Sequence, residues 1–78
     1  MTFQELINMY EDDRPAKLKI TEAAAMMDVT PRFLQMGLQH GCFPFGCGIE
    51  MTEWAYYINT ERFIRYMTGQ PLTFSTAG

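Results

Sequence analysis

HGCFPFGCGIEMTEWAYYIN, residues 40–59, is the stretch that decides the fold of this chain. Its histidine, two cysteines and closely spaced glycines could belong to a metal site, to a disulfide or to a β-hairpin. Apolar residues recur in it at every second position, which is the period of a strand. They are Phe45, Cys47 and Ile49, and Tyr56 and Ile58 would lie beside them on the returning strand. We therefore expect a β-hairpin with its turn near residues 50–53 and its apolar face toward the core.

A metal site at this place would be incomplete. His40, Cys42 and Cys47 could supply three zinc ligands, but a structural zinc site is normally four-coordinate. The chain contains one histidine and two cysteines, so Glu50 or a partner molecule would have to provide the fourth ligand. Because we expect a cytoplasmic protein, a disulfide between the two cysteines is disfavoured as well. We therefore predict no metal and no cofactor, with Cys47 as a small apolar residue on the core-facing side of a strand.

Two helices joined by a short turn are predicted directly before the hairpin. Thr21 is a suitable N-cap for EAAAMM, a run of strong helix formers, which predicts a helix over about 21–27. Thr30 is a second N-cap and is followed by proline, which favours the first position of a helix, so the next helix spans 31–39. Asp28 can adopt the left-handed conformation that the turn between them requires. This pattern is typical of a helix-turn-helix.

Capping signals predict one further helix at each end of the domain. Thr2 and Glu5 form a capping-box pattern at the start, and the helix that follows carries one apolar stripe. The stripe consists of Phe3, Leu6, Ile7 and Tyr10. The last helix begins after Asn59 or Thr60 and ends at Gly69, a residue type that favours helix C-termini.

The expected core uses the inner faces of these elements. Helical periodicity places in it Phe33, Leu34, Leu38, Phe63, Tyr66 and Met67. So small a domain has few other large side chains to bury, so Trp54 and Tyr56 are also expected to lie largely in the core.

The composition indicates one small globular domain. The 78 residues are 47% hydrophobic and 19% charged, as in folded chains. The predicted elements occupy residues 1–69, and we expect residues 70–78, which have no charge and no period, to be a flexible tail. No apolar run could cross a bilayer and the first residues lack a signal-peptide pattern, so we expect a cytoplasmic protein. The net charge of −3 argues against a non-specific binder of nucleic acid or membrane.

Residues 18–46 and 54–67 carry a resemblance to a known family. LKITEAAAMMDVTPRFLQMGLQHGCFPFG and WAYYINTERFIRYM resemble the winged helix-turn-helix domains of the excisionase and MerR-like superfamily, as found in small phage and mobile-element proteins. Asp28 stands where these domains commonly have glycine. The resemblance implies an α+β, mostly α fold: a small winged helix-turn-helix with a two-stranded β-hairpin wing. It also implies a sequence-specific DNA-binding protein, either an excisionase-like architectural factor or a small transcriptional regulator.

The same resemblance implies which residues would contact double-stranded DNA. The helix over 31–39 would lie in the major groove and read bases with its solvent face. That face carries Arg32, Gln35, Met36 and Gln39. Phosphates would be contacted by Lys17, Lys19 and the backbone amides at Thr21 and Thr30.

The hairpin tip favours a different ligand, because DNA phosphates would repel its negative charge. The tip consists of Glu50, Met51, Thr52 and Glu53. The alternative function is therefore a winged-helix adaptor or inhibitor that binds a phage or host protein through its acidic N-terminal segment and its wing. The wing residues in question are Glu50, Thr52, Glu53 and Trp54.

Two further questions concern oligomers and catalysis. The apolar stripe of the first helix could pack on its own domain or form the seam of a homodimer. The sequence has no phosphate-binding glycine loop and no HExxH motif, so we expect that the protein is not an enzyme.

We predict that the domain folds without a metal ion, because the chain lacks a fourth cysteine or histidine ligand. The thermal unfolding midpoint should be the same with and without a strong chelator. A large drop in that midpoint on chelation, together with stoichiometric zinc in the untreated protein, would contradict a hairpin that needs no metal.

Overall fold

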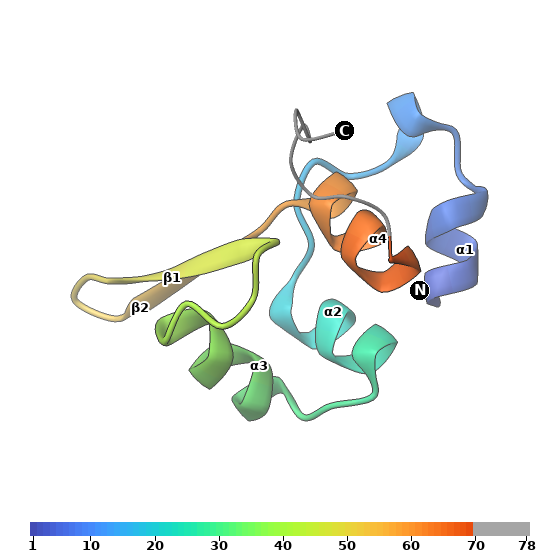
Figure 1. Cartoon of the computed structure of the whole chain (residues 1–78). Helices are drawn as coiled ribbons and strands as arrows, with labels where there is room; N and C mark the ends of the chain where they lie inside the picture. Colours follow the sequence, from blue (N-terminus) through green and yellow to red (C-terminus); the bar gives the residue numbers. More distant parts are fainter. Residues whose placement is uncertain (70–78) are drawn as a thin grey trace, which may run out of the picture.

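The computed structural model describes residues 1–69, which form four α-helices, a short 3-10 helix and one antiparallel β-hairpin (Figure 1). The expected flexible tail, residues 70–78, lies outside the described residues. In chain order the elements are α1 (Phe3–Asn8), η1 (Glu11–Asp13), α2 (Ile20–Met27), α3 (Pro31–Gln39), β1 (Gly46–Glu50), β2 (Trp54–Ile58) and α4 (Thr60–Thr68). The fold is α+β and mostly α, as predicted, with a helix-turn-helix followed by a hairpin.

Local capping sets the start of three helices as the sequence predicts. The Thr2 hydroxyl accepts a hydrogen bond from the Glu5 amide at 3.1 Å, and the Glu5 carboxylate accepts one from the Thr2 amide at 2.7 Å. The bond from the Thr2 amide is the main reason that the pKa of Glu5 lies below its usual value. Thr30 caps α3 and Asn59 caps α4 through their side-chain oxygens. The turn between α2 and α3 is also confirmed, since Asp28 has the left-handed angles φ 60° and ψ 42°.

The helix α2 begins earlier than predicted. Lys19 occupies the capping position, and the Glu22 carboxylate accepts a hydrogen bond from the Lys19 amide at 3.5 Å. Thr21 therefore lies inside the helix, and the prediction that it is the N-cap was wrong. The cause is tertiary: the Leu18 amide donates to the Ile58 carbonyl at 3.1 Å, so the extended chain is held up to this point and then turns into the helix.

The hairpin is one antiparallel ladder whose turn lies at residues 51–53, as predicted. A bridge between Lys17 and Asn59 attaches the segment before α2 to the base of β2. On the β1 side, the Asn59 amide donates to the Phe45 carbonyl at 2.8 Å. The segment before α2 thus holds the base of the hairpin, and the Asn59–Phe45 bond extends its ladder, while its tip extends away from the helices (Figure 1).

The strand β1 turns its apolar side chains outward, which is the opposite of the prediction. Cys47 and Ile49 are exposed, although Phe45 just before them is fully buried. The chain makes a turn at Pro44 and Phe45 before β1 begins. Phe45 is therefore not part of the strand, and its burial does not indicate which side Cys47 and Ile49 face. The prediction that these three residues share the core face was therefore wrong.

The inner face of β1 consists largely of glycine. Gly48 lies opposite Tyr56, and a β-carbon on Gly48 would lie 3.2 Å from the Tyr56 ring and 3.4 Å from the Gln39 amide nitrogen. A β-carbon on Gly46 would overlap the Tyr57 carbonyl oxygen. Glycine at these two positions therefore lets β1 lie directly against β2 and the end of α3.

Phe45 and Phe63 form the centre of the core. Their ring centroids lie 5.1 Å apart in an edge-to-face arrangement, and both side chains are fully buried. The other buried hydrophobic residues are Leu6, Leu18, Ala23, Ala24, Leu34, Leu38, Ile58 and Ile64. The predicted burial of Leu34, Leu38 and Phe63 is therefore confirmed, whereas Tyr56 and Met67 are only half-buried.

Phe33 is the clearest departure from the predicted core, since it is 57% exposed. The ring of Phe43 packs over Gly37 and takes the space beside this side of α3. The ring of Phe33 lies against that of Phe43, with centroids 6.2 Å apart, and its remaining surface faces solvent. Sequence periodicity missed this because Phe43 comes from the irregular segment after the helix.

Three other aromatic residues are also more exposed than predicted. Tyr66 packs against Phe45 with centroids 5.1 Å apart but leaves much of its ring in solvent. Trp54 lies at the tip end of β2 and stacks on Tyr56, which covers only part of the indole. Tyr10 is 82% exposed because α1 ends before it, so it does not continue the apolar stripe.

Arg14 holds α1 against α4. Its guanidinium donates to the Leu6 carbonyl at 3.2 Å and to the Ile7 carbonyl at 3.1 Å, which satisfies the last turn of α1. The same group pairs with Glu61 in the first turn of α4 at 3.1 Å. Leu6 is fully buried and Phe3 packs against the core, so the apolar stripe of α1 is covered by its own domain.

We predict that Phe63→Ala lowers the free energy of unfolding by about 3–5 kcal/mol, because it empties the centre of the core. Phe33→Ala is the matched control: it removes the same ring from an exposed position and should cost less than about 1 kcal/mol. The measurement is urea unfolding of both variants, and equal losses would mean that the face assignment of α3 is wrong.

Candidate functional site

The outward face of α3 is defined by its buried side. Leu34 and Leu38 face the core, so the opposite side of the helix carries Arg32 and Met36, both of which are exposed. Gln35 and Gln39 are half-buried, and Gln39 contacts the hairpin. Two of the four predicted base-reading residues thus lie at the centre of the exposed face, and the two glutamines lie on one edge of it.

Gln39 connects this face to the hairpin. Its side-chain amide donates a hydrogen bond to the Tyr56 hydroxyl at 2.6 Å. One donor of Gln39 is therefore occupied within the protein, while its carbonyl oxygen and second donor can serve another partner. The bond also fixes α3 relative to β2, so the side chains of both elements have a defined relative position.

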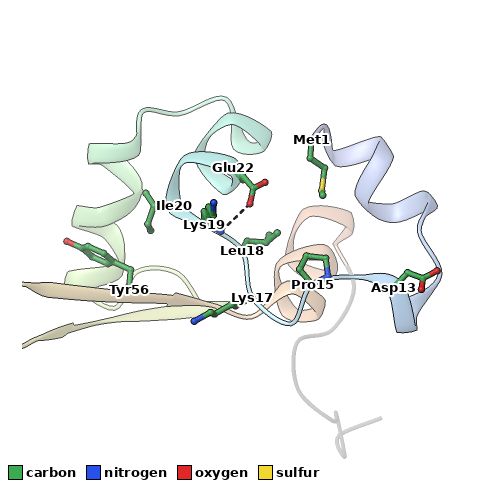
Figure 2. Close-up of a pocket in the computed structure, with 9 residues that line it drawn as sticks. All are labelled: Met1, Asp13, Pro15, Lys17, Leu18, Lys19, Ile20, Glu22 and Tyr56. Atoms are coloured by element: carbon green, nitrogen blue, oxygen red, sulfur yellow. Dashed lines mark hydrogen bonds between the residues drawn. The ribbon is translucent and has the colours of Figure 1, made fainter.

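A groove lies beside this connection, and its volume is about 670 Å³. Figure 2 shows the side chains that line it, which come from Met1, from η1 and the segment after it, from α2 and from β2. Lys17 and Lys19 lie on it, and Tyr56 lines the same groove. Tyr56 thus contacts Gln39 of α3 and also lines the groove that contains the two lysines. Asp13 and Glu22 also line the groove, so its charge is mixed.

The two predicted backbone contacts differ in their surroundings. The Thr30 hydroxyl oxygen accepts the Phe33 amide, and its hydrogen can still be donated to an outside acceptor. At Thr21 the Glu22 carboxylate lies beside the start of α2, where it receives the Lys19 amide, and its negative charge would repel an anion. Thr30 is therefore the better placed of the two for a contact with an anion.

The tip of the hairpin is exposed along its whole length. Glu50, Thr52 and Glu53 all face solvent, and the turn is closed by a bond from the Met51 amide to the Glu53 carbonyl at 3.1 Å. Trp54 follows directly, with its ring nearly parallel to that of Tyr56. The tip lies at the opposite end of the molecule from α1 and η1 (Figure 1), so the two acidic regions of the chain are well separated.

The outer face of the hairpin is an uncharged surface that the sequence did not reveal. Cys47 pairs with Tyr57 and Ile49 with Ala55 across the ladder, and all four residues are exposed. The strand alternation predicted Cys47 and Ile49 on the core side, so this surface was missed. The signal that could have revealed it is the pair of glycines at 46 and 48, which mark the face that lies on other backbone.

The residues weighed as zinc ligands do not form a cluster. Within residues 1–69, no three histidine, cysteine, aspartate or glutamate side chains lie close enough together to hold a metal ion. Cys42 and Cys47 are both free thiols on the surface. No described helix is long and apolar enough to span a bilayer.

Comparisons with family models, curated proteins and solved structures found no match to the chain.

We predict that both cysteines react with a thiol reagent such as DTNB in the folded protein, because both side chains reach solvent. Cys47→Ser should leave one reactive thiol and should change stability little, since the side chain is outside the core. If Cys47 reacts only after denaturation, the outward orientation of the β1 side chains is wrong.

Proposed function

We propose that the protein binds double-stranded DNA with α3 in the major groove, as the winged helix-turn-helix proteins that it resembles do. In this proposal Arg32 and Met36 contact bases, Gln35 and Gln39 contact them from the hairpin edge, and the sugar-phosphate backbone runs past Lys17, Lys19 and Thr30. The biological role would be that of a small phage or mobile-element regulator or an excisionase-like architectural factor. Such a protein would act in the cytoplasm, where its DNA is.

The observation that carries this proposal is the junction at Tyr56. The outward face of α3 meets the hairpin through the bond between Gln39 and Tyr56, and the groove with Lys17 and Lys19 begins at the same tyrosine. The proposed base-reading surface therefore lies beside two lysines that could contact phosphates, in a groove that Asp13 and Glu22 also line. Both kinds of contact are needed in a DNA interface, because base contacts supply specificity and phosphate contacts supply orientation and much of the affinity.

The distribution of charge is compatible with this role despite the net charge of −3. The acidic helix η1 lies away from α3 and from the hairpin tip (Figure 1), and of its residues Asp13 lines the groove with Lys17 and Lys19. Glu50 and Glu53 occupy the tip, which extends beyond the helices. In our proposal the tip stays clear of the phosphates, and these charges restrict binding to sites where α3 makes specific contacts.

A second candidate function is supported by the outer face of the hairpin. This face carries exposed Ile49 and Tyr57 without any charge, and it is followed by the acidic tip. Aromatic and aliphatic side chains bordered by charge are typical of protein interfaces. A phage or host protein with an apolar surface and a basic rim would fit it.

We predict that Arg32→Ala weakens binding to a preferred duplex by about 5- to 150-fold, since one arginine–guanine pair contributes about 1–3 kcal/mol of discrimination. Arg65→Ala is the matched control, because it removes the same charge from α4, outside the proposed interface. The preferred duplex would first be selected from a random pool, and affinities would be measured by fluorescence anisotropy at two salt concentrations.

The double variant Glu50→Lys with Glu53→Lys separates the two candidate functions. A DNA-binding protein should bind all duplexes more tightly after this reversal, with the larger gain at low salt. A protein-binding adaptor should lose its co-purifying partner instead, and should keep that partner when Arg32 is replaced. Absence of duplex binding even at low salt would contradict the DNA proposal.

A further inference from the structure

Phe33 and Met36 together give the outward face of α3 an apolar surface. Phe33 is 57% exposed and Met36 is 39% exposed, in a domain with a small core. The two residues are three positions apart on the helix and Arg32 lies four positions before Met36, so all three side chains are neighbours on one surface. Two exposed apolar side chains that adjoin each other beside an arginine form a contiguous patch, which makes this surface a candidate for contact with a ligand.

The ring of Phe33 is held in place and does not depend on a ligand for its position. Its neighbour Phe43 stacks on the buried Phe45 with centroids 5.2 Å apart, and it packs over Gly37 of α3. Phe33 lies against Phe43 with centroids 6.2 Å apart. Because this support is part of the core, little conformational entropy would be lost when the exposed part of the ring is covered.

The major groove offers one common apolar group, the C5-methyl of thymine. Residues near the N-terminus of a recognition helix are those that reach base edges, and Phe33 lies in the first turn of α3. Arg32 beside it has the chemistry to pair with a guanine. On the DNA-binding function proposed above, we propose that Phe33 is a specificity-determining residue that contacts thymine methyl groups, assisted by Met36, next to a guanine bound by Arg32.

The inference predicts the kind of DNA that the protein selects. From a pool of random duplexes, the protein should enrich sites in which a guanine is flanked by thymine. Burial of one methyl group is worth a factor of about three to five in affinity, so replacing a contacted thymine by uracil should weaken binding by about that factor. Uracil forms the same base pair and lacks only the methyl group, so the substitution tests this contact alone.

The experiment measures the affinities of the selected duplex and of its uracil-substituted forms for three proteins. The wild type should prefer thymine. Phe33→Ala should bind both duplexes equally, at the weaker affinity. Ile49→Ala is the matched control: Ile49 is 56% exposed, on the outer face of the hairpin, and this variant should keep the preference for thymine. Circular dichroism would verify that both variants remain folded.

The possible failures are distinguishable. If the wild type binds the selected duplex but does not distinguish thymine from uracil, the role of Phe33 is wrong and the DNA-binding function stands. The same holds if Phe33→Ala retains the full thymine preference. If no duplex is bound or enriched, the proposed function fails, and the inference fails with it.

Discussion

The packing of Phe45 against Phe63 is the contact on which the rest of the structure depends. Phe45 lies where the chain leaves the helix-turn-helix and enters the hairpin, and Phe63 lies in the middle of α4. The Phe45 carbonyl also accepts the amide of Asn59, the residue that caps α4. One residue therefore joins the helix-turn-helix, the start of the hairpin and the last helix. This contact, together with the Gln39–Tyr56 bond, sets the direction of the hairpin relative to α3.

The consequences of that contact extend to the candidate interface. The turn that buries Phe45 places the glycine face of β1 against α3, and this brings Tyr56 within hydrogen-bonding distance of Gln39. The same turn directs Phe43 onto Gly37, which displaces Phe33 into solvent. Both edges of the outward face of α3 are thus shaped by the segment between α3 and β1. The packing of the core therefore determines the shape of the surface that we propose for DNA binding.

Arg14 fixes the position of the acidic N-terminal segment, as Phe45 fixes that of the hairpin. In the sequence it begins a stretch, residues 14–40, that is richer in lysine and arginine than the segment before it. In the structure its guanidinium is used internally, on two carbonyls of α1 and on Glu61 of α4. The result is that α1 and η1 are held at the end of the molecule opposite the hairpin (Figure 1). Net charge alone therefore describes the proposed interface poorly.

The sequence by itself determined the order of the elements, most of their boundaries and the α+β class. Caps at Thr2, Thr30 and Asn59 and the left-handed turn at Asp28 depend on neighbours in the chain, and local patterns are sufficient to find them. Only the tertiary structure decided which face of β1 is exposed and which aromatic side chains reach solvent. Periodicity defines the spacing of side chains within one helix or strand. A turn such as that at Phe45 changes which face of the following strand points to the core. The exposure of Phe33 depends on its contact with Phe43, which comes from another segment, so periodicity within α3 could not reveal it. For Cys47 the local signal was the pair of glycines at 46 and 48, which outweighs the apolar alternation.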